Sequence, residues 1–131
     1  MRLLVAEDNL NNQQVARELL EHEGAIVRIA NHGQEAVEAV AHADPQFDVV
    51  LMDVQMPRMG GIEATRAIRA STVNGASTVP ILAMTAHALD TDREECLQAG
   101  MNGYISKPVR AEDLYRAIES VLDKIRLPEA S

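Results

Sequence analysis

The stretch FDVVLMDVQMPRMGG (residues 47–61) joins a run of apolar residues to a single carboxylate. Residues 49–52 are Val-Val-Leu-Met, and Asp53 follows them directly, before the turn residues Pro57 and Gly60–Gly61. A short apolar run bounded by turn residues predicts a buried β-strand. Asp53 is therefore expected at the carboxyl end of a buried strand, where the chain leaves the sheet.

Short apolar runs of this kind recur along the chain and alternate with helical patterns. Five strands are expected, at residues 2–6, 25–30, up to Met52, 80–84 and 103–107. Strands that are apolar throughout are typical of parallel sheets whose two faces are both covered by helices. Parallel strands also need crossover connections, which are usually helices. The sequence therefore predicts one α/β domain, a five-stranded parallel sheet flanked by five helices.

Five helical patterns follow these strands in turn. They cover Val15–Leu20, Ala36–Ala41, Ile62–Ile68, residues 88–99 and Leu114–Ile125. Gly24 and Gly100 are expected to end the first and the fourth helix, because glycine readily adopts the left-handed conformation that often follows a helix. Asn31 is expected to be the N-cap of the second helix, with Gln34 three residues on as its reciprocal partner.

The composition fits one domain and argues against nucleic-acid binding. The 131 residues are 47% hydrophobic, enough for one sizeable core, but include only two tyrosines and one phenylalanine. Twenty acidic against twelve basic residues give a net charge of -8. A negative surface repels a phosphate backbone, and few aromatic side chains are present for base stacking. Direct nucleic-acid binding is therefore not expected.

Cysteine content and hydropathy favour a reducing, aqueous compartment. Cys96 is the single cysteine, so no internal disulfide can form, and it is expected to lie buried or half-buried in a helix. No apolar run approaches the roughly 20 residues of a membrane span, and the N-terminus has no signal-peptide pattern. The segment is expected to be cytoplasmic and to make no membrane contact, whether or not a longer parent chain is membrane-anchored.

Polar residues follow four of the five expected strands. They are Glu7 and Asp8, then Asp53, Thr85 and Lys107. In an open parallel sheet, ligands bind outside the carboxyl ends of the strands. If these four strand ends lie side by side, three carboxylates, a hydroxyl and an ammonium group converge in one pocket.

Such a pocket predicts a divalent cation and phosphoryl chemistry. Neighbouring carboxylates repel one another unless a proton or a cation neutralises them. Oxygen ligands without a nearby histidine or cysteine select Mg²⁺ or Mn²⁺. A carboxylate surrounded by a cation, a lysine and a hydroxyl can attack a phosphoryl group as a nucleophile. The expected product is an acyl phosphate on Asp53.

Four segments carry a close family resemblance. They are AEDN (6–9), DVVLMDVQMPRMGG (48–61), ILAMTAHA (81–88) and CLQAGMNGYISKP (96–108). Together they resemble the response-regulator receiver domain of two-component signalling, in the form common in hybrid sensor histidine kinases. The resemblance covers essentially residues 2–124, and none of its motif positions departs from the family pattern.

The resemblance implies roles for the acidic residues. Asp53 would be the phosphoacceptor. Glu7 and Asp8 would be the acidic pair that holds Mg²⁺ directly or through water, and Gln55 would contribute its backbone carbonyl to the ion. The implied strand order of the sheet is 2-1-3-4-5, the flavodoxin-like topology.

It also implies roles for residues on the two last strands. Thr85 and Lys107 would bind the phosphoryl oxygens, and Tyr104 would be an aromatic switch that rotates when Thr85 moves. The Lys107–Pro108 peptide bond is usually cis in the family.

The function implied by the resemblance is that of a phosphoacceptor domain. It would take a phosphoryl group from a histidine kinase or a histidine phosphotransfer protein and then change conformation. Residues 1–125 are expected to form the receiver domain and residues 126–131 a tail or linker, either stand-alone or within a hybrid kinase. Such a domain catalyses its own phosphorylation and dephosphorylation but is not by itself a turnover enzyme.

Two alternatives stand beside this interpretation. An aspartate-nucleophile phosphohydrolase also carries its nucleophile after a central strand, but it needs a second carboxylic acid two residues on, where this chain has Gln55. A degenerate receiver could act as a constitutive interaction scaffold. It would be expected to have lost at least one of the five strand-end residues, and none is lost.

Overall fold

The five apolar runs form one parallel sheet, as the sequence predicts. The computed structural model describes the chain except for residues 44–45, 57–58, 72–74, 87–89, 108 and 127–131. The strands are β1 (Arg2–Ala6), β2 (Ile26–Ala30), β3 (Val49–Asp53), β4 (Ile81–Thr85) and β5 (Gly103–Ser106). They lie in the order β2-β1-β3-β4-β5 with every neighbouring pair parallel, which confirms both the fold class and the strand order.

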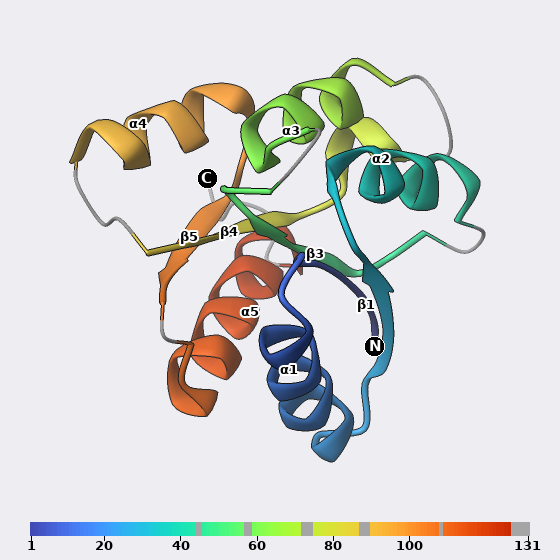
Figure 1. The fold of residues 1–131 in the computed structure, drawn as a ribbon, viewed down its shortest axis with the longest axis vertical. Helices are drawn as coiled ribbons and strands as arrows, with labels where there is room; N and C mark the ends of the chain where they lie inside the picture. The colour runs from blue at the N-terminus through green and yellow to red at the C-terminus, as the bar shows by residue number, and fades with distance from the viewer. Residues whose placement is uncertain (44–45, 57–58, 72–74, 87–89, 108, 127–131) are drawn as a thin grey trace.

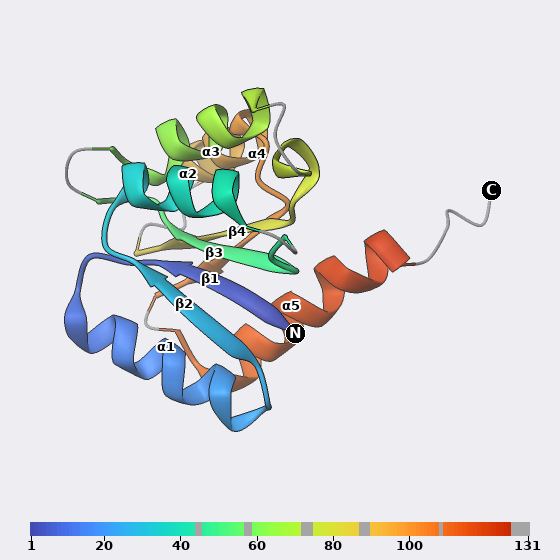
Figure 2. The ribbon, with the colours of Figure 1, turned by 90° about the vertical axis from the view of Figure 1, so that its right-hand side faces the viewer.

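Helices cover both faces of the sheet. They are α1 (Leu10–His22), α2 (Gly33–His42), α3 (Gly61–Ala70), α4 (Asp90–Ala99) and α5 (Ala111–Arg126), with a short 3₁₀ helix η1 (Ala76–Thr78) before β4. Figures 1 and 2 show α2, α3 and α4 on one face, and α1 and α5 on the other. The predicted stops hold, because Gly24 and Gly100 follow α1 and α4 with φ of 86° and 111°.

The strands are apolar throughout because successive side chains enter two separate cores. In β1, Leu4 and Ala6 belong to the apolar cluster beneath α2 and α3, whereas Leu3 and Val5 belong to the cluster against α1 and α5. Full burial of a valine or leucine side chain stabilises the fold by about 1.5–3 kcal/mol. Cys96 is buried in the first cluster, as expected.

The prediction that Asn31 caps α2 is wrong. The helix begins at Gly33, and its N-cap is His32, whose Nδ1 accepts a hydrogen bond from the backbone N–H of Glu35 at 3.2 Å. The Asn31 side chain instead contacts Gln13 and Glu35. The polar contacts across the β2–α2 connection therefore shift the cap by one residue.

The apolar stripe predicted for the first helix is also only partly buried. Ala16 and Leu20 face the core, but Val15 is 48% exposed. Gln13 is buried in its place on that face of α1. The amide of a polar residue is thus directed inward, and an aliphatic side chain outward.

Some of the expectations fall outside the described residues. These are the turn at Pro57, the peptide bond before Pro108 and the tail beyond residue 126. Among the helices of the described part of the chain, none has the length and the apolarity needed to cross a membrane.

Candidate functional site

The register of β1 against β3 brings the first two acidic strand ends together. Ala6, the last residue of β1, pairs with Met52. The next residues, Glu7 and Asp53, therefore leave the sheet at the same level. Both residues are buried, with 2% and 3% of their surfaces exposed, so two carboxylates face one small region at the edge of the sheet.

The other two strand ends join the same edge. Thr85 pairs with Ser106 across β4 and β5, and the backbone N–H of Lys107 donates to the carbonyl of Thr85 at 2.7 Å. Thr85 is buried and lines the same pocket as the acidic residues. The sheet thus gathers the four polar strand ends that the sequence predicts would converge.

Three carboxylates form the floor and rim of this pocket. Glu7, Asp8 and Asp53 each offer an oxygen atom, and these oxygens all lie within 4.8 Å of one another. Asp8 is exposed, whereas the other two are buried, so the group opens to solvent on one side. Mutual repulsion at this separation favours any cation that can enter.

Lys107 is a cation that already contacts this group. Its Nζ lies 2.9 Å from Glu7 Oε2 and 3.0 Å from Asp53 Oδ2. Burial of the ammonium lowers the pKa of Lys107, but the hydrogen bonds to the two carboxylates and their negative charges outweigh it, so the pKa is raised above its ordinary 10.5. The lysine therefore stays charged at neutral pH.

The backbone around Asp53 fixes the direction of its carboxylate. Oδ1 accepts a hydrogen bond from the backbone N–H of Gln55 at 3.1 Å, while Oδ2 faces Lys107. Behind it, the start of α3 comes so close that a Cβ atom at Gly61 would overlap the carbonyl oxygen of Asp53. The Gly61 N–H also donates to the carbonyl of Val54 at 3.0 Å, so the strand end and the helix start are joined main chain to main chain.

The pocket contains most of the residues predicted for it. Its lining is Glu7, Asp8, Asn9, Asn12, Asp53, Val54, Gln55, Thr85, Ala86 and Lys107. Tyr104 is not among them. It lies half-buried on β5, where the Arg93 guanidinium stacks over its ring at 4.3 Å from the centroid. Pro108 lies outside the described residues.

The donor set fits a hard divalent cation. Three carboxylates against the one ammonium that contacts them leave a net charge of -2 among these described groups. All the donors that the pocket presents to a cation are oxygens, from carboxylates, amides, a hydroxyl and main-chain carbonyls. Oxygen-only sites of this kind suit Mg²⁺, with water completing its shell.

A family model for the response regulator receiver domain matches residues 3–119. The chain belongs to this family. It is a receiver domain of the kind used in phosphorelay signalling, with an acidic pocket at the carboxyl ends of its strands.

The receiver domain is similar to parts of much longer proteins. It is 38% identical over 126 residues to the "Hybrid signal transduction histidine kinase I" of Dictyostelium discoideum. The match covers 94% of this chain but only 7% of the kinase. The chain therefore spans a small part of that curated relative.

Solved receiver domains share its fold. The receiver domain of sensor histidine kinase PA1611 from Pseudomonas aeruginosa, crystallised with magnesium in its active-site cleft, is 40% identical. That match has a TM-score of 0.83 and covers 92% of this chain and 96% of the other. A Saccharomyces cerevisiae co-crystal of the histidine phosphotransfer protein Ypd1 with the Ssk1 receiver domain matches with a TM-score of 0.85, 28% identity, and coverage of 100% and 94%.

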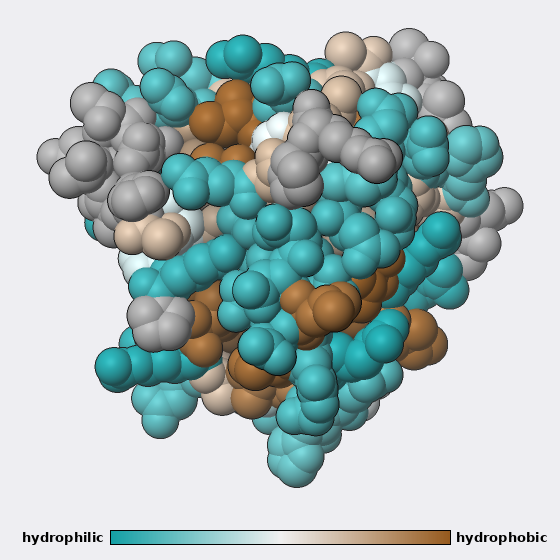
Figure 3. All heavy atoms as spheres, in the orientation of Figure 1, coloured by the Kyte–Doolittle hydropathy of each residue, from teal (hydrophilic) through white to brown (hydrophobic). Residues whose placement is uncertain are grey.

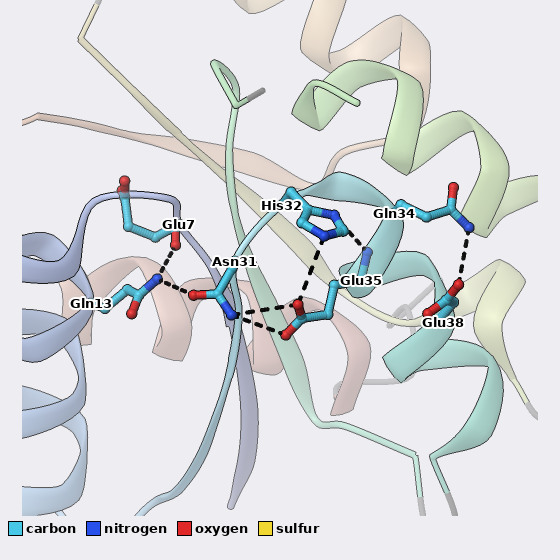
Figure 4. Close-up of polar contacts among 7 residues, drawn as sticks. All are labelled: Glu7, Gln13, Asn31, His32, Gln34, Glu35 and Glu38. Carbon is cyan, nitrogen blue, oxygen red and sulfur yellow. Dashed lines mark hydrogen bonds and ion pairs between the residues drawn. The ribbon is translucent and has the colours of Figure 1, made fainter. Parts of the chain in front are cut away.

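The receiver domain also contains polar contacts beside the pocket that sequence reasoning missed. Gln13 of α1 and Asn31 of the β2–α2 connection join the main chain of Glu7 to Glu35 (Figure 4). Gln13 is polar and gives no hydropathy signal of its own. The one available sign is its place three residues before Ala16 and seven before Leu20, the buried positions of the same helix.

Proposed function

We propose that the domain accepts a phosphoryl group from a phosphohistidine onto Asp53 in a Mg²⁺-dependent reaction and relays a signal by changing conformation. One observation carries the proposal: the buried Asp53 carboxylate contacts Lys107 and shares a pocket with Glu7, Asp8 and Thr85. A buried carboxylate with a charged partner in a pocket is the arrangement expected of an activated nucleophile rather than of a solvated helix cap.

The reaction exchanges one phosphorus bond for another. A carboxylate oxygen of Asp53 forms a bond to phosphorus as the bond from phosphorus to the imidazole nitrogen of the donor breaks. The electron pair of that bond stays on the nitrogen. Because the other ring nitrogen of the donor carries a proton, the leaving group is a neutral histidine, and Asp53 becomes an acyl phosphate. The hydrogen bonds from Gln55 N–H and Lys107 hold the carboxylate plane, and each oxygen retains lone pairs beyond those two contacts.

Lys107 and Thr85 can bind the incoming phosphoryl oxygens. An ammonium group has three donors, and the described contacts of Lys107 use two of them, to Glu7 and Asp53. The third can be directed to a phosphoryl oxygen. The Thr85 hydroxyl lines the same pocket and supplies a second donor. Both groups stabilise charge where it develops during transfer.

The acidic residues would hold the cation. Glu7, Asp8, Asp53 and the backbone carbonyl of Gln55 are the proposed ligands of Mg²⁺, or of Mn²⁺, directly or through water. When bound, the ion neutralises negative charge on the phosphoryl group and the carboxylates. The magnesium in the active-site cleft of the PA1611 receiver domain supports Mg²⁺ as the ion.

Labelling by a small donor tests the function directly. With acetyl phosphate and Mg²⁺, we expect intact-protein mass spectrometry to show a single added phosphoryl group, and none when the cation is removed by EDTA. The cation dependence follows from the net negative charge of the pocket, which repels the negatively charged phosphoryl group of the donor. A constitutive scaffold would stay unlabelled in both samples, and a phosphohydrolase would consume donor with steady turnover far beyond one equivalent.

The surface beside the pocket suits a helical partner. A groove continues from the acidic pocket along α1, lined by Asn12, Val15, Ala16, Met84 and Val109 with pocket residues. Hydrophobic surface gathers in the lower centre of Figure 3, where α1 lies in Figure 1. Leu10, the first residue of α1, is 75% exposed. We propose that a histidine kinase or histidine phosphotransfer protein docks here. The Ypd1–Ssk1 co-crystal, which pairs a histidine phosphotransfer protein with a receiver domain, supports this kind of partner.

A charge on this surface should separate the two kinds of donor. Leu10→Glu is expected to slow transfer from a phosphorylated histidine phosphotransfer protein at least about tenfold, equivalent to 1.4 kcal/mol, because a carboxylate would be buried unpaired against an apolar partner. Labelling by acetyl phosphate, which needs no docking surface, should be unchanged.

Ile26→Glu is the matched control. Ile26 is also a large apolar residue and 64% exposed, but it begins β2 at the opposite end of the sheet. Its variant should behave like the parent with both donors. Equal slowing in the two variants, or loss of acetyl phosphate labelling in Leu10→Glu, would contradict docking through α1.

The proposed switch links Thr85 to Tyr104. Movement of the Thr85 hydroxyl toward a phosphoryl group would open space beside β5 for the Tyr104 ring. Rotation of the ring must break its stacking with Arg93, an interaction worth about 0.5–1 kcal/mol at such sites. A hydrogen bond to a charged group contributes about 1.5–3 kcal/mol, so the contacts of one phosphoryl group can outweigh that cost.

Removal of the Thr85 hydroxyl should uncouple phosphorylation from this change. Thr85→Ala is expected to accept a phosphoryl group on Asp53, because the nucleophile and the acidic residues remain. With the phosphoryl mimic beryllofluoride, the amide NMR signals of the parent should change from Asp53 through Tyr104 into α4. In the variant the shifts should stay near the pocket. Distant shifts of the parent's size in Thr85→Ala would rule out this route.

A further inference from the structure

A buried glutamine connects the acidic pocket to the neighbouring loop. Gln13 lies on the inner face of α1, and its Nε2 donates to the carbonyl oxygen of Glu7 at 2.5 Å and to Asn31 Oδ1 at 2.9 Å. Figure 4 shows the chain of contacts running on from Asn31 to Glu35 at the start of α2. Both hydrogens of the Gln13 amide are therefore directed to defined acceptors.

The contacts fix the orientation of each amide in turn. An ionised carboxylate only accepts hydrogen bonds, so Asn31 must direct its Nδ2 to Glu35, at 3.3 and 3.4 Å from the two oxygens. Its Oδ1 then faces α1, and Gln13 must direct its NH₂ group toward it. The same NH₂ group reaches the Glu7 carbonyl. The amide of Gln13 has one orientation that satisfies all these partners.

Glu7 is consequently held at its main chain from two sides. Its backbone N–H donates to the carbonyl of Ala30 at 3.0 Å, and its carbonyl accepts from Gln13. Its side chain is held separately, by Asn9 N–H at Oε1 and Lys107 at Oε2. Since Glu7 and Asp8 are adjacent, the peptide between them carries the Gln13 hydrogen bond, and its plane sets the direction in which Asp8 leaves the strand.

We infer that Gln13 is a positioning residue for the cation site, acting through the Glu7–Asp8 peptide with Asn31 as the group that orients its amide. The inference rests on the proposed Mg²⁺ site. Gln13 itself lines neither the acidic pocket nor the groove beside it. Groups that orient metal ligands from behind typically contribute about 10–100-fold to metal affinity.

Mg²⁺ titration calorimetry of three variants tests the inference. Gln13→Leu keeps the side-chain volume and removes both donors, and we expect its Kd for Mg²⁺ to rise about tenfold. Asn31→Ala removes only the orienting group and should raise Kd less, by a few fold. Gln14→Leu is the matched control, because Gln14 is the exposed neighbour whose described side-chain contact is with Glu18, and its Kd should equal the parent's.

A second readout separates positioning from a merely structural role. At saturating Mg²⁺, the rate of acetyl phosphate labelling of Gln13→Leu should return to near the parent value, because Asp53, Lys107 and Thr85 are untouched. A structural role alone would lower the melting temperature and leave the Kd of the folded protein unchanged, and that result would overturn the inference. If Gln13→Leu does not fold, Asn31→Ala, whose side chain is exposed, decides the matter by the same criterion.

The parent serves as the test of the underlying site. Saturable Mg²⁺ binding by the parent together with an unchanged Kd in Gln13→Leu and Asn31→Ala would refute only the role of Gln13. A parent that binds no Mg²⁺ would refute the proposed cation site itself, and the positioning role with it.

Discussion

Asp53→Asn is expected to abolish labelling by acetyl phosphate under conditions in which the parent gains one phosphoryl group. The amide has nearly the same shape, so the fold should persist and the Gln55 N–H can still donate to Oδ1. An amide oxygen is, however, a far poorer nucleophile than a carboxylate, and no acyl phosphate can form. The comparison is made by intact-protein mass spectrometry, with peptide mapping of the labelled parent to locate the group.

Asp48→Asn is the control for this variant. Asp48 immediately precedes β3, at the opposite end of the strand from Asp53, is exposed and accepts a hydrogen bond from the backbone N–H of Arg2 at 2.7 Å. Its replacement removes the same charge from the chain without touching the pocket, so labelling should match the parent. Persistent labelling of Asp53→Asn at the parental rate would assign the phosphoacceptor to another residue.

Lys107→Met should destabilise the cation-free domain by about 2–3 kcal/mol. Removing one partner of a buried ion pair leaves uncompensated charge and typically costs about 3–5 kcal/mol; the partial exposure of Lys107, 22% of its side chain, places the expected loss at or below the lower end. The free energy of unfolding is measured by urea denaturation in EDTA. Arg110→Met, which removes an exposed charge three residues on, should leave it nearly unchanged.

Mg²⁺ should restore more stability to Lys107→Met than it adds to the parent. Without the ammonium, the carboxylates repel one another more strongly and bind a cation more tightly. Mg²⁺ at a concentration ten times its Kd adds about 1.4 kcal/mol to the free energy of unfolding by mass action. If Mg²⁺ stabilised the two proteins equally, Lys107 and the cation would not be neutralising the same carboxylates.

The contribution of Lys107 also has a defined pH dependence. Because its pKa is raised in the folded state, the stabilisation is fully present below the ordinary value of 10.5 and is lost as the pH rises through the folded pKa. The difference between parent and Lys107→Met should therefore hold from neutral pH up to 10.5 and shrink above it.

The sheet and the pocket could be predicted because both depend on the order in which apolar strands, helices and polar strand ends follow one another along the chain. Strands buried on two faces must be apolar throughout, and the carboxyl ends of parallel strands share one edge, so Asp53 and Lys107 were placed together from sequence alone. Strand limits were correct to within about a residue; Thr85, for example, proved to be the last residue of β4 rather than the first after it.

The side-chain contacts between α1 and the loop from β2 to α2 could not be predicted in this way. Asn31 has the residue type of a helix cap, yet its amide serves Gln13 and Glu35, and a histidine takes over the cap. The apolar stripe likewise predicts Val15 in the core, and the polarity of Gln13 hides its place on the buried face of α1. Such outcomes depend on where a carbonyl of a neighbouring loop lies in space, and hydropathy patterns contain no information on that.

The overlap that any side chain at Gly61 would create has a consequence for engineering. The end of β3 and the start of α3 meet through main-chain atoms, so the position of Asp53 relative to α3 is independent of the side chains that α3 presents to solvent. Residues such as Glu63 and Arg66, which are exposed on that helix, can be exchanged for those of another receiver without shifting the strand end. A chimera that exchanges the exposed residues of α3 should therefore keep the chemistry of its host.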